Sequence, residues 1–158
     1  GITEERVAFR AAPSAGALYP IETYSIVHRV ADLTPGIYHY GVREHALEHL
    51  QEGDFRSQVT EAGLHQGFLG QANVCLVLSA ILQRARWKYH ERAYRYVLLE
   101  AGHIAQNLYL EAASMGLGAC AVGAFFDGTL NDLLGVDGTD EAALYIVSVG
   151  ERPGGGGA

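Results

Sequence analysis

The chain has 158 residues, of which 49% are hydrophobic and 18% charged, and its formal net charge at pH 7 is −7. Its lysines and arginines form no run long enough to follow a phosphate backbone, which argues against a nucleic-acid partner. It contains no apolar run of the roughly 18 to 20 residues that span a membrane, and no signal-peptide pattern. We therefore expect a cytoplasmic protein that does not enter a membrane.

A chain of this length is expected to form one compact domain, which we place at residues 1–153. The glycine-rich tail, 154–158, is expected to be disordered. Residues 1–12 show no strong periodicity, which suggests that an upstream part of the domain is missing. Cys75 and Cys120 each lie among small apolar residues, which indicates buried, reduced thiols rather than a disulfide or metal site.

The first half of the chain predicts antiparallel strands. A turn-rich loop over 13–20 precedes a strand over 21–30, which is rich in residues that favour β-structure. Residues 36–40 and 46–50 alternate in polarity across a short connection, so they predict a hairpin with Gly41 near its turn.

The middle of the chain predicts the core. Residues 55–63 are typical of a short helix, and the apolar run over 72–80 is typical of a strand buried on both faces at the centre of a sheet. A long helix is predicted from about 89 to 115, with Gly116 as its stop. Its apolar residues extend beyond one stripe, so we expect a second subunit to enclose it.

The last part of the chain predicts an apolar segment over 116–126, a helical turn over 128–134 and a closing strand over 144–149. Strands therefore cluster at both ends of the sequence with the main helix between them. This order favours an α+β fold over a doubly wound parallel sheet.

Three sequence segments contain the residues that point to a particular function. They are RAAPSAGALYPIETY at 10–24, WKYHERAYRYVLLEAGH at 87–103 and MGLGACAVGAFFD at 115–127. Together, in order and spacing, they resemble the nitroreductase superfamily, in particular its SagB-type branch of azoline dehydrogenases, which form thiazoles and oxazoles. The resemblance spans most of the chain.

This resemblance implies a nitroreductase-like fold with a central, mostly antiparallel sheet flanked by helices. It also implies FMN as the cofactor, bound at the interface of an intertwined homodimer. An arginine-rich element that precedes the first segment in the family is absent here. The chain is thus either a fragment of a longer protein, or another group supplies that charge.

The resemblance assigns cofactor-binding residues in two groups. The first group is a loop of small residues that could approach a flat ring, Ser14, Ala15, Gly16 and Ala17. From spacing alone, this loop is more simply an ordinary turn. The second group matches the stretch beside the isoalloxazine ring, where a backbone amide could bind flavin N5: Ala121, Val122, Gly123 and Ala124. Arg10 and Arg152 are the candidates for the FMN phosphate, with solvated surface arginines as the alternative.

Lys88 and Tyr89 match the Lys-Tyr dipeptide of the azoline-oxidising branch, so the resemblance makes them the catalytic candidates. Aromatising an azoline removes a hydride and a proton, and the proton requires a base near the ring. Without the resemblance, an exposed helix start is the simpler interpretation of Lys88.

The histidines invite a metal hypothesis, but His39, His45 and His49 lie in a predicted hairpin without acidic or cysteine partners at ligand spacing. We therefore predict no metal site. His103, Tyr94 and Tyr96 are expected to be packed core residues of the long helix, although the resemblance leaves a role for Tyr94 in the site open.

The leading functional hypothesis is oxidation of thiazoline or oxazoline rings in a ribosomally made peptide, with dioxygen reoxidising the FMN. The implied partners are the azoline peptide with its leader and a cyclodehydratase complex. One alternative is a generic NAD(P)H-dependent FMN reductase of nitroaromatics or quinones. An alternative of another class is a flavin-free scaffold within a modifying complex.

Overall fold

The computed structural model describes residues 10–152, within which six strands form one antiparallel sheet in the order β3-β2-β1-β4-β6-β5. The strands are β1 (Ile21–Val27), β2 (Gly36–Gly41), β3 (Ala46–Glu52), β4 (Val74–Ala80), β5 (Gly118–Val122) and β6 (Ala142–Gly150). The helices are α1 (Arg56–Ala62), α2 (Phe68–Gln71), α3 (Gln83–Tyr89), α4 (Ala93–Ser114) and α5 (Asp127–Leu134), with 3-10 turns η1 (Ala15–Ala17) and η2 (His90–Arg92). The predicted α+β class and antiparallel sheet are confirmed.

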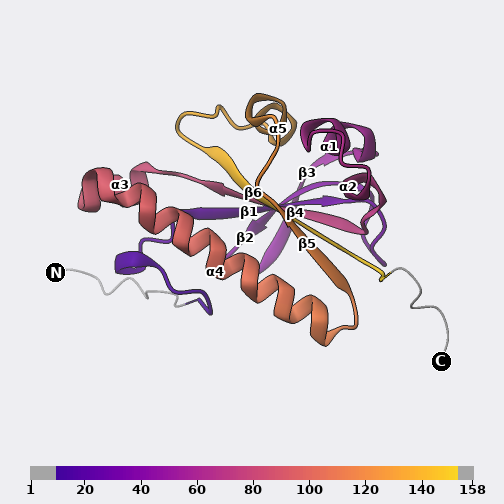
Figure 1. Ribbon diagram of the computed structural model, residues 1–158, viewed down its shortest axis with the longest axis horizontal. Helices are drawn as coiled ribbons and strands as arrows, with labels where there is room; N and C mark the ends of the chain where they lie inside the picture. The colour runs from indigo at the N-terminus through magenta and orange to yellow at the C-terminus, as the bar shows by residue number, and fades with distance from the viewer. Residues whose placement is uncertain (1–9, 153–158) are drawn as a thin grey trace.

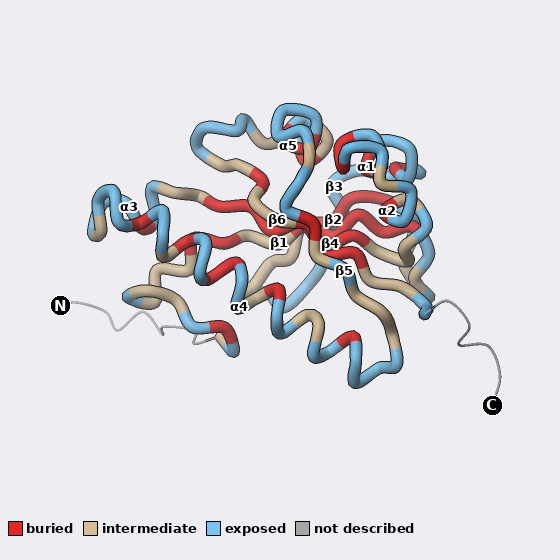
Figure 2. The backbone as a smooth tube through the Cα atoms, viewed as in Figure 1, coloured by how far each residue is buried: buried red, intermediate tan, exposed pale blue. Residues whose placement is uncertain are grey.

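The sheet carries a hydrophobic core on each face. The long helix α4 crosses one face, and α1, α2 and α5 cover the other (Figure 1). Burial concentrates in the strands and on the side of α4 that faces them (Figure 2). The α4 face buries residues at helical spacing such as Val97, Ala101 and Ala105, as the sequence periodicity predicts.

Strand β4 occupies the centre of the sheet, as its unbroken apolar run predicts. It pairs with β1 on one side and β6 on the other, and Val77 lies between Tyr24 and Ile146. The predicted hairpin is also present as β2 and β3. These pairings fix where the segments that follow β4 and β6 leave the sheet.

The predicted helix over 89–115 is wrong in its N-terminal part. The chain breaks at His90, whose φ of 50° lies in the left-handed region, so α3 ends at Tyr89 and α4 begins only at Ala93. Helix α3 escaped prediction because Ala85 is its only buried residue, which leaves no apolar stripe to detect. Helix α2 is too short to show a period.

The outer face of α4 mixes polar residues with leucines that nothing within residues 10–152 covers. Leu98, Leu99 and Leu110 are 44%, 55% and 61% exposed. His103 and Tyr94 are also exposed, so their expected packing in the core is wrong; Tyr94 borders a hollow with Leu82 and Arg86 instead. Tyr96 does pack, edge-on against Tyr89 with ring centroids 5.0 Å apart.

The two cysteines differ. Cys75 is a buried free thiol, as predicted, whereas Cys120 is exposed. Cys120 lies on edge strand β5, where side chains alternate between faces. Its neighbours Ala119 and Ala121 pack toward α4, so the Cys120 thiol points to the opposite face, into an open hollow that Phe68 and Gln71 of α2 also line.

The residues described include no helix with both the length and the apolar character of a membrane span. The expected tail over 154–158 and most of the segment over 1–12 lie outside the described residues.

One glycine inside α4 and one just beyond its end should respond to alanine with opposite signs. Gly116 ends the helix with a φ of 74°, where the Leu117 amide bonds the Ala112 carbonyl, and Gly102 lies in the helix interior. A β-carbon meets nothing within 4 Å at either position. We expect Gly116→Ala to lower the free energy of unfolding by about 1 kcal/mol and Gly102→Ala to raise it by about 0.5 to 1 kcal/mol. Urea denaturation measures both, and shifts of the same sign would contradict the assignment of Gly116 as the cap.

Candidate functional site

The loop before β1 forms a tight, closed turn. The Ser14 carbonyl accepts a hydrogen bond from the Ala17 amide at 3.1 Å, and the Ser14 hydroxyl accepts one from the Tyr19 amide at 2.9 Å. Gly16 adopts a φ of 63°, a conformation that glycine takes without strain. The loop thus presents its backbone at Gly16, with Ser14 at its base.

Lys88 and Tyr89 lie directly against this loop. A β-carbon on Gly16 would lie 2.6 Å from Tyr89 Oη and 2.9 Å from Lys88 Nζ. The structure therefore brings the predicted catalytic pair to the predicted cofactor loop, although the two are far apart in sequence. Only a residue without a side chain leaves room for both polar groups at this point.

An ionic network holds α3 in place. Arg84 donates to the Tyr19 carbonyl at 3.2 Å and pairs with Glu22 of β1. The other Glu22 oxygen bonds His39 Nε2 of β2 at 2.9 Å. Through these contacts the start of α3 is fixed to two strands, so the Lys88–Tyr89 end has a defined position.

The two side chains of the pair have different surroundings. Lys88 is exposed, and its ammonium group lies 5.4 Å from the centroid of the Tyr89 ring. Tyr89 is half-buried and its ring packs against Tyr96 of α4. Packing thus holds the ring of Tyr89, whereas the Lys88 side chain extends toward solvent.

Glu100 of α4 is a site residue that the sequence reasoning missed. It is only 3% exposed and lies near the Ser14 side chain, Arg10 and His103. Burial raises the pKa of its carboxyl, while Ser14, Arg10 and His103 act in the opposite direction. The available clue was that Glu100 falls at the helical spacing of the buried residues of α4. Acids are rarely buried there without a partner.

Arg10 lies on the same side of the molecule as the loop. Its guanidinium group stacks over the Tyr19 ring at 4.5 Å, and its Nε is buried without a partner among residues 10–152. Arg10 and Glu100 both line a cavity of about 170 Å³. A buried donor without a partner marks a place where an anion could bind.

The second predicted group follows the edge of the sheet. The Ala121 amide points outward and donates to the Tyr109 hydroxyl at 2.6 Å. By the alternation of an antiparallel ladder, the next amide, that of Val122, points toward β6. Gly123 and Ala124 follow the ladder and are exposed. Their amides are the remaining candidates to meet flavin N5.

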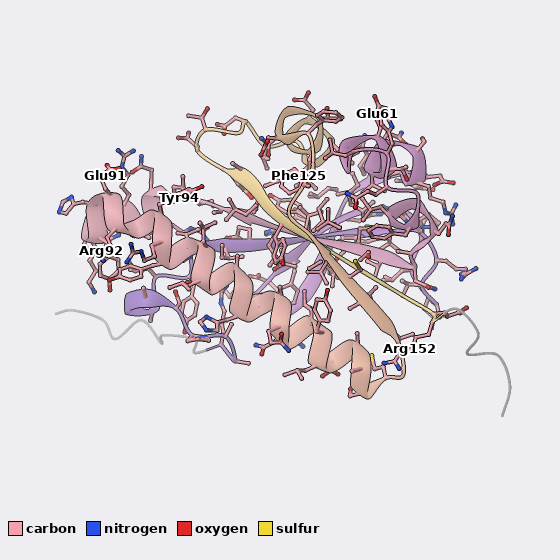
Figure 3. All side chains as sticks on the ribbon, in the orientation of Figure 1. Glu61, Glu91, Arg92, Tyr94, Phe125 and Arg152 are labelled. Atoms are coloured by element: carbon pink, nitrogen blue, oxygen red, sulfur yellow. The ribbon has the colours of Figure 1, made fainter. Side chains whose placement is uncertain are left out.

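Arg152 follows β6 at the far end of the sheet. Its Nε donates to the Leu117 carbonyl at 3.1 Å, and it lines an open hollow of about 480 Å³ beside Gly118 and Cys120. The register places Gly150 opposite Gly118, whereas Ala142 at the other end of β6 faces Ala80, which precedes α3. Arg152 thus lies remote from the tip of α3 and η2 (Figure 3).

The candidates therefore form two separate groups. The loop group contains Arg10, the Ser14–Ala17 loop, Lys88, Tyr89 and Glu100, and the edge group contains residues 121–124 and Arg152. No hydrogen bond or ion pair between the described residues joins them. Between residues 10 and 152, no three His, Cys, Asp or Glu residues are grouped to hold a metal.

Comparison with known proteins identifies relatives over nearly the whole chain. The model of the nitroreductase family matches residues 4–151. The Methanocaldococcus jannaschii protein MJ1384, named as a nitroreductase, is 37% identical over 152 residues, which cover 96% of this chain and 75% of that protein. The microcin B17-processing protein McbC of Escherichia coli is 30% identical over 146 residues, covering 88% of this chain and 53% of McbC.

Solved structures agree with this relationship. A crystal structure of a protein named as a nitroreductase from Anabaena variabilis has a TM-score of 0.86 and 36% identity, covering 90% of this chain and 29% of that one. The E. coli microcin synthetase McbBCD complex with truncated pro-MccB17 bound has a TM-score of 0.82 and 28% identity, covering 92% of this chain and 57% of that one. The chain thus spans about half the length of McbC and less than a third of the Anabaena chain.

Glu100→Gln should change the pH dependence of stability. Because burial raises the pKa of Glu100 above its ordinary value of 4.5, this group stabilises the fold below that pH and loses the contribution as the pH rises through the folded-state pKa. Glutamine has nearly the same size and shape but does not titrate. The free energy of unfolding of the variant, relative to wild type, should therefore increase from pH 4 to pH 7 in urea denaturation. The exposed Glu61→Gln is the control, and parallel pH profiles for all three proteins would contradict the buried acid.

Proposed function

Because this chain belongs to the nitroreductase family, whose oxidoreductases use FMN, we propose that it oxidises thiazoline or oxazoline rings to azoles in a ribosomally made peptide. The observation that carries the proposal is the contact of Lys88 and Tyr89 with Gly16. It places an amine and a phenol, both able to exchange protons, at the loop proposed to line the flavin. The similarity to McbC, which processes microcin B17, supports a peptide substrate.

The exposed edge of β5 fits FMN. Arg152 lies at the start of β5 with its Nε on a carbonyl, which leaves its terminal nitrogens for the phosphate. Gly123 lies at the other end, where a β-carbon would meet only Tyr145, at 3.8 Å. The backbone there is open to a flat ring, and Gly123 or Ala124 would donate an amide to N5. Bound FMN would supply the hydride acceptor.

The residues of the loop group would manage the proton. An azoline that becomes an azole loses a hydride to FMN and a proton from a neighbouring carbon. We assign that proton to Lys88 and Tyr89, whose Nζ and Oη converge at Gly16. Tyr89, held by Tyr96, would fix the geometry, and exposed Lys88 would exchange the proton with solvent.

A homodimer would unite the two groups. The loop group and the edge group do not meet within one chain, and the outer face of α4 exposes Leu98, Leu99 and Leu110. Burying these leucines against a second copy would remove apolar surface from water. We propose that the loop of one protomer and the edge of its partner share one FMN.

The proposed partners follow from the relatives. The solved McbBCD complex contains a truncated precursor peptide, so a comparable assembly, with a cyclodehydratase that makes the azoline, is the proposed context of this chain. We propose that it works in the cytoplasm, consistent with its two free cysteines.

The second candidate is a generic FMN reductase that uses NAD(P)H, favoured by the 37% identity to a protein named as a nitroreductase. Rapid reduction of the bound flavin by NAD(P)H would support it. A flavin-free scaffold is the remaining alternative, and flavin absorbance of the purified protein separates it from both enzymes.

The decisive test is substitution of the pair. Lys88→Ala and Tyr89→Phe should each retain the fold and the flavin spectrum but slow azoline oxidation by about 10²- to 10⁴-fold, the usual contribution of a positioned acid or base. The assay follows the loss of two hydrogens per ring by mass spectrometry of an azoline-containing peptide, at equal flavin loading.

The exposed Arg43→Ala in the β2–β3 turn is the control, because it removes a long cationic side chain that is not among those at Gly16. If both Lys88→Ala and Tyr89→Phe oxidise azolines as fast as wild type, the azoline assignment loses its main support and the generic reductase becomes the better hypothesis.

Gly123→Val should lower the FMN content. The fold itself has room for a side chain at this exposed position, so a loss of flavin would report the ring and not misfolding. We expect a clear fall in flavin stoichiometry after desalting, with unchanged circular dichroism. Gly128→Val, at an exposed position of α5 where a β-carbon meets nothing within 4 Å, is the control. Full flavin occupancy in folded Gly123→Val would show that FMN binds at another site.

A further inference from the structure

The tip formed by α3, η2 and the first residues of α4, residues 84–95, concentrates positive charge on an acidic protein. It contains Arg84, Arg86, Lys88, Arg92 and Arg95 against Glu91 as the single acid, whereas the whole chain has a formal net charge of −7. A cluster of positive charge on an otherwise acidic protein produces a local electrostatic field that attracts anions.

Part of this charge is already neutralised. Arg84 pairs with Glu22, and Arg86 pairs with Glu91 at 3.0 Å. By contrast, no ion pair within residues 10–152 engages Lys88, Arg92 or Arg95. Three cations of the tip are thus available to an external partner.

The tip also exposes large aromatic side chains. Trp87 is 67% exposed and Tyr94 is 60% exposed. Tyr94 borders two hollows, one of about 360 Å³ with Arg92 and Arg95 and one of about 180 Å³ with Arg86. Figure 3 shows Glu91, Arg92 and Tyr94 together at one end of the molecule. Exposed aromatic and arginine side chains of this kind are enriched where proteins bind proteins.

We propose that the tip over 84–95 docks an acidic segment of the peptide substrate, rich in Asp or Glu, beside the ring to be oxidised. This rests on the proposed function for the identity of the reaction. Arg92 is only four residues after Lys88, across the short η2 turn, so a segment held there would lie near the catalytic pair. A nucleic acid fits less well, because three unpaired cations cannot follow a phosphate backbone and the rest of the acidic chain would repel it.

The test uses a probe that contains no azoline. A short fluorescein-labelled peptide rich in Asp and Glu is titrated with the FMN-loaded protein at low salt, and binding is measured by anisotropy. Arg92→Glu and Arg95→Glu should each weaken binding roughly fivefold to tenfold, because an attraction becomes a repulsion. Arg43→Glu makes the same charge change in the exposed β2–β3 turn and should bind like wild type. The differences should vanish in about 1 M salt.

Four results of these titrations would overturn the proposal. The tip variants could bind the acidic probe as tightly as wild type, or an Asn- and Gln-rich version of the probe could bind equally well. A single-stranded oligonucleotide of equal charge could bind more tightly than the peptide, which would make the tip a nucleic-acid surface. Light scattering accompanies each titration, and a change of mass only in the tip variants would make the tip a subunit interface.

The two proposals fail separately. If azoline peptides are oxidised at the same kcat/KM with and without acidic flanks, the docking inference fails and the proposed function stands. If the acidic probe binds at the tip but no azoline is oxidised, the proposed function fails and the docking surface stands.

Discussion

The position of Glu22 controls the rest of the candidate site. This half-buried carboxylate of β1 accepts from Arg84 of α3 with one oxygen and meets His39 of β2 with the other. Because α3 has only one buried residue, packing alone gives it little hold on the sheet. The ionic contact thus fixes α3, and α3 in turn brings Lys88 and Tyr89 to Gly16. Charge-assisted bonds of this kind are stronger than neutral ones, and partial burial shields them from solvent.

Glu100 makes a complementary contact from the opposite direction. It approaches Ser14 from α4, so a buried acid lies against one end of the loop. The end of α3 lies against the loop at Gly16. The loop backbone therefore has little freedom between two fixed elements, although its own sequence is small and flexible. A cofactor that approaches such a loop loses little entropy in ordering it.

The sequence predicted the elements whose burial follows a simple period. The apolar run of β4 and the Val97, Ala101 and Ala105 stripe of α4 are examples, because each is buried along a regular face. It did not predict α3, which depends on an ion pair from a distant strand, or the break at His90, which depends on backbone conformation. Glu100 was missed for the same reason: its role is defined by Ser14, a residue far away in sequence. The exposure of Cys120 depends on β5 being an edge, which only the strand order reveals.

The two edges of the sheet also differ in how they resist self-association. The β3 edge is exposed along its whole length and carries Glu48 and Glu52, charges that discourage another strand from pairing with it. The β5 edge reads GACAV and carries no charge, and Tyr109 covers its Ala121 amide. The β5 edge therefore has its shortness, but no charge, to discourage another strand from pairing with it, and a bound ligand or a partner would add that protection. Newly synthesised chains that have not yet bound a ligand or a partner along β5 would therefore be the ones most able to associate through this edge.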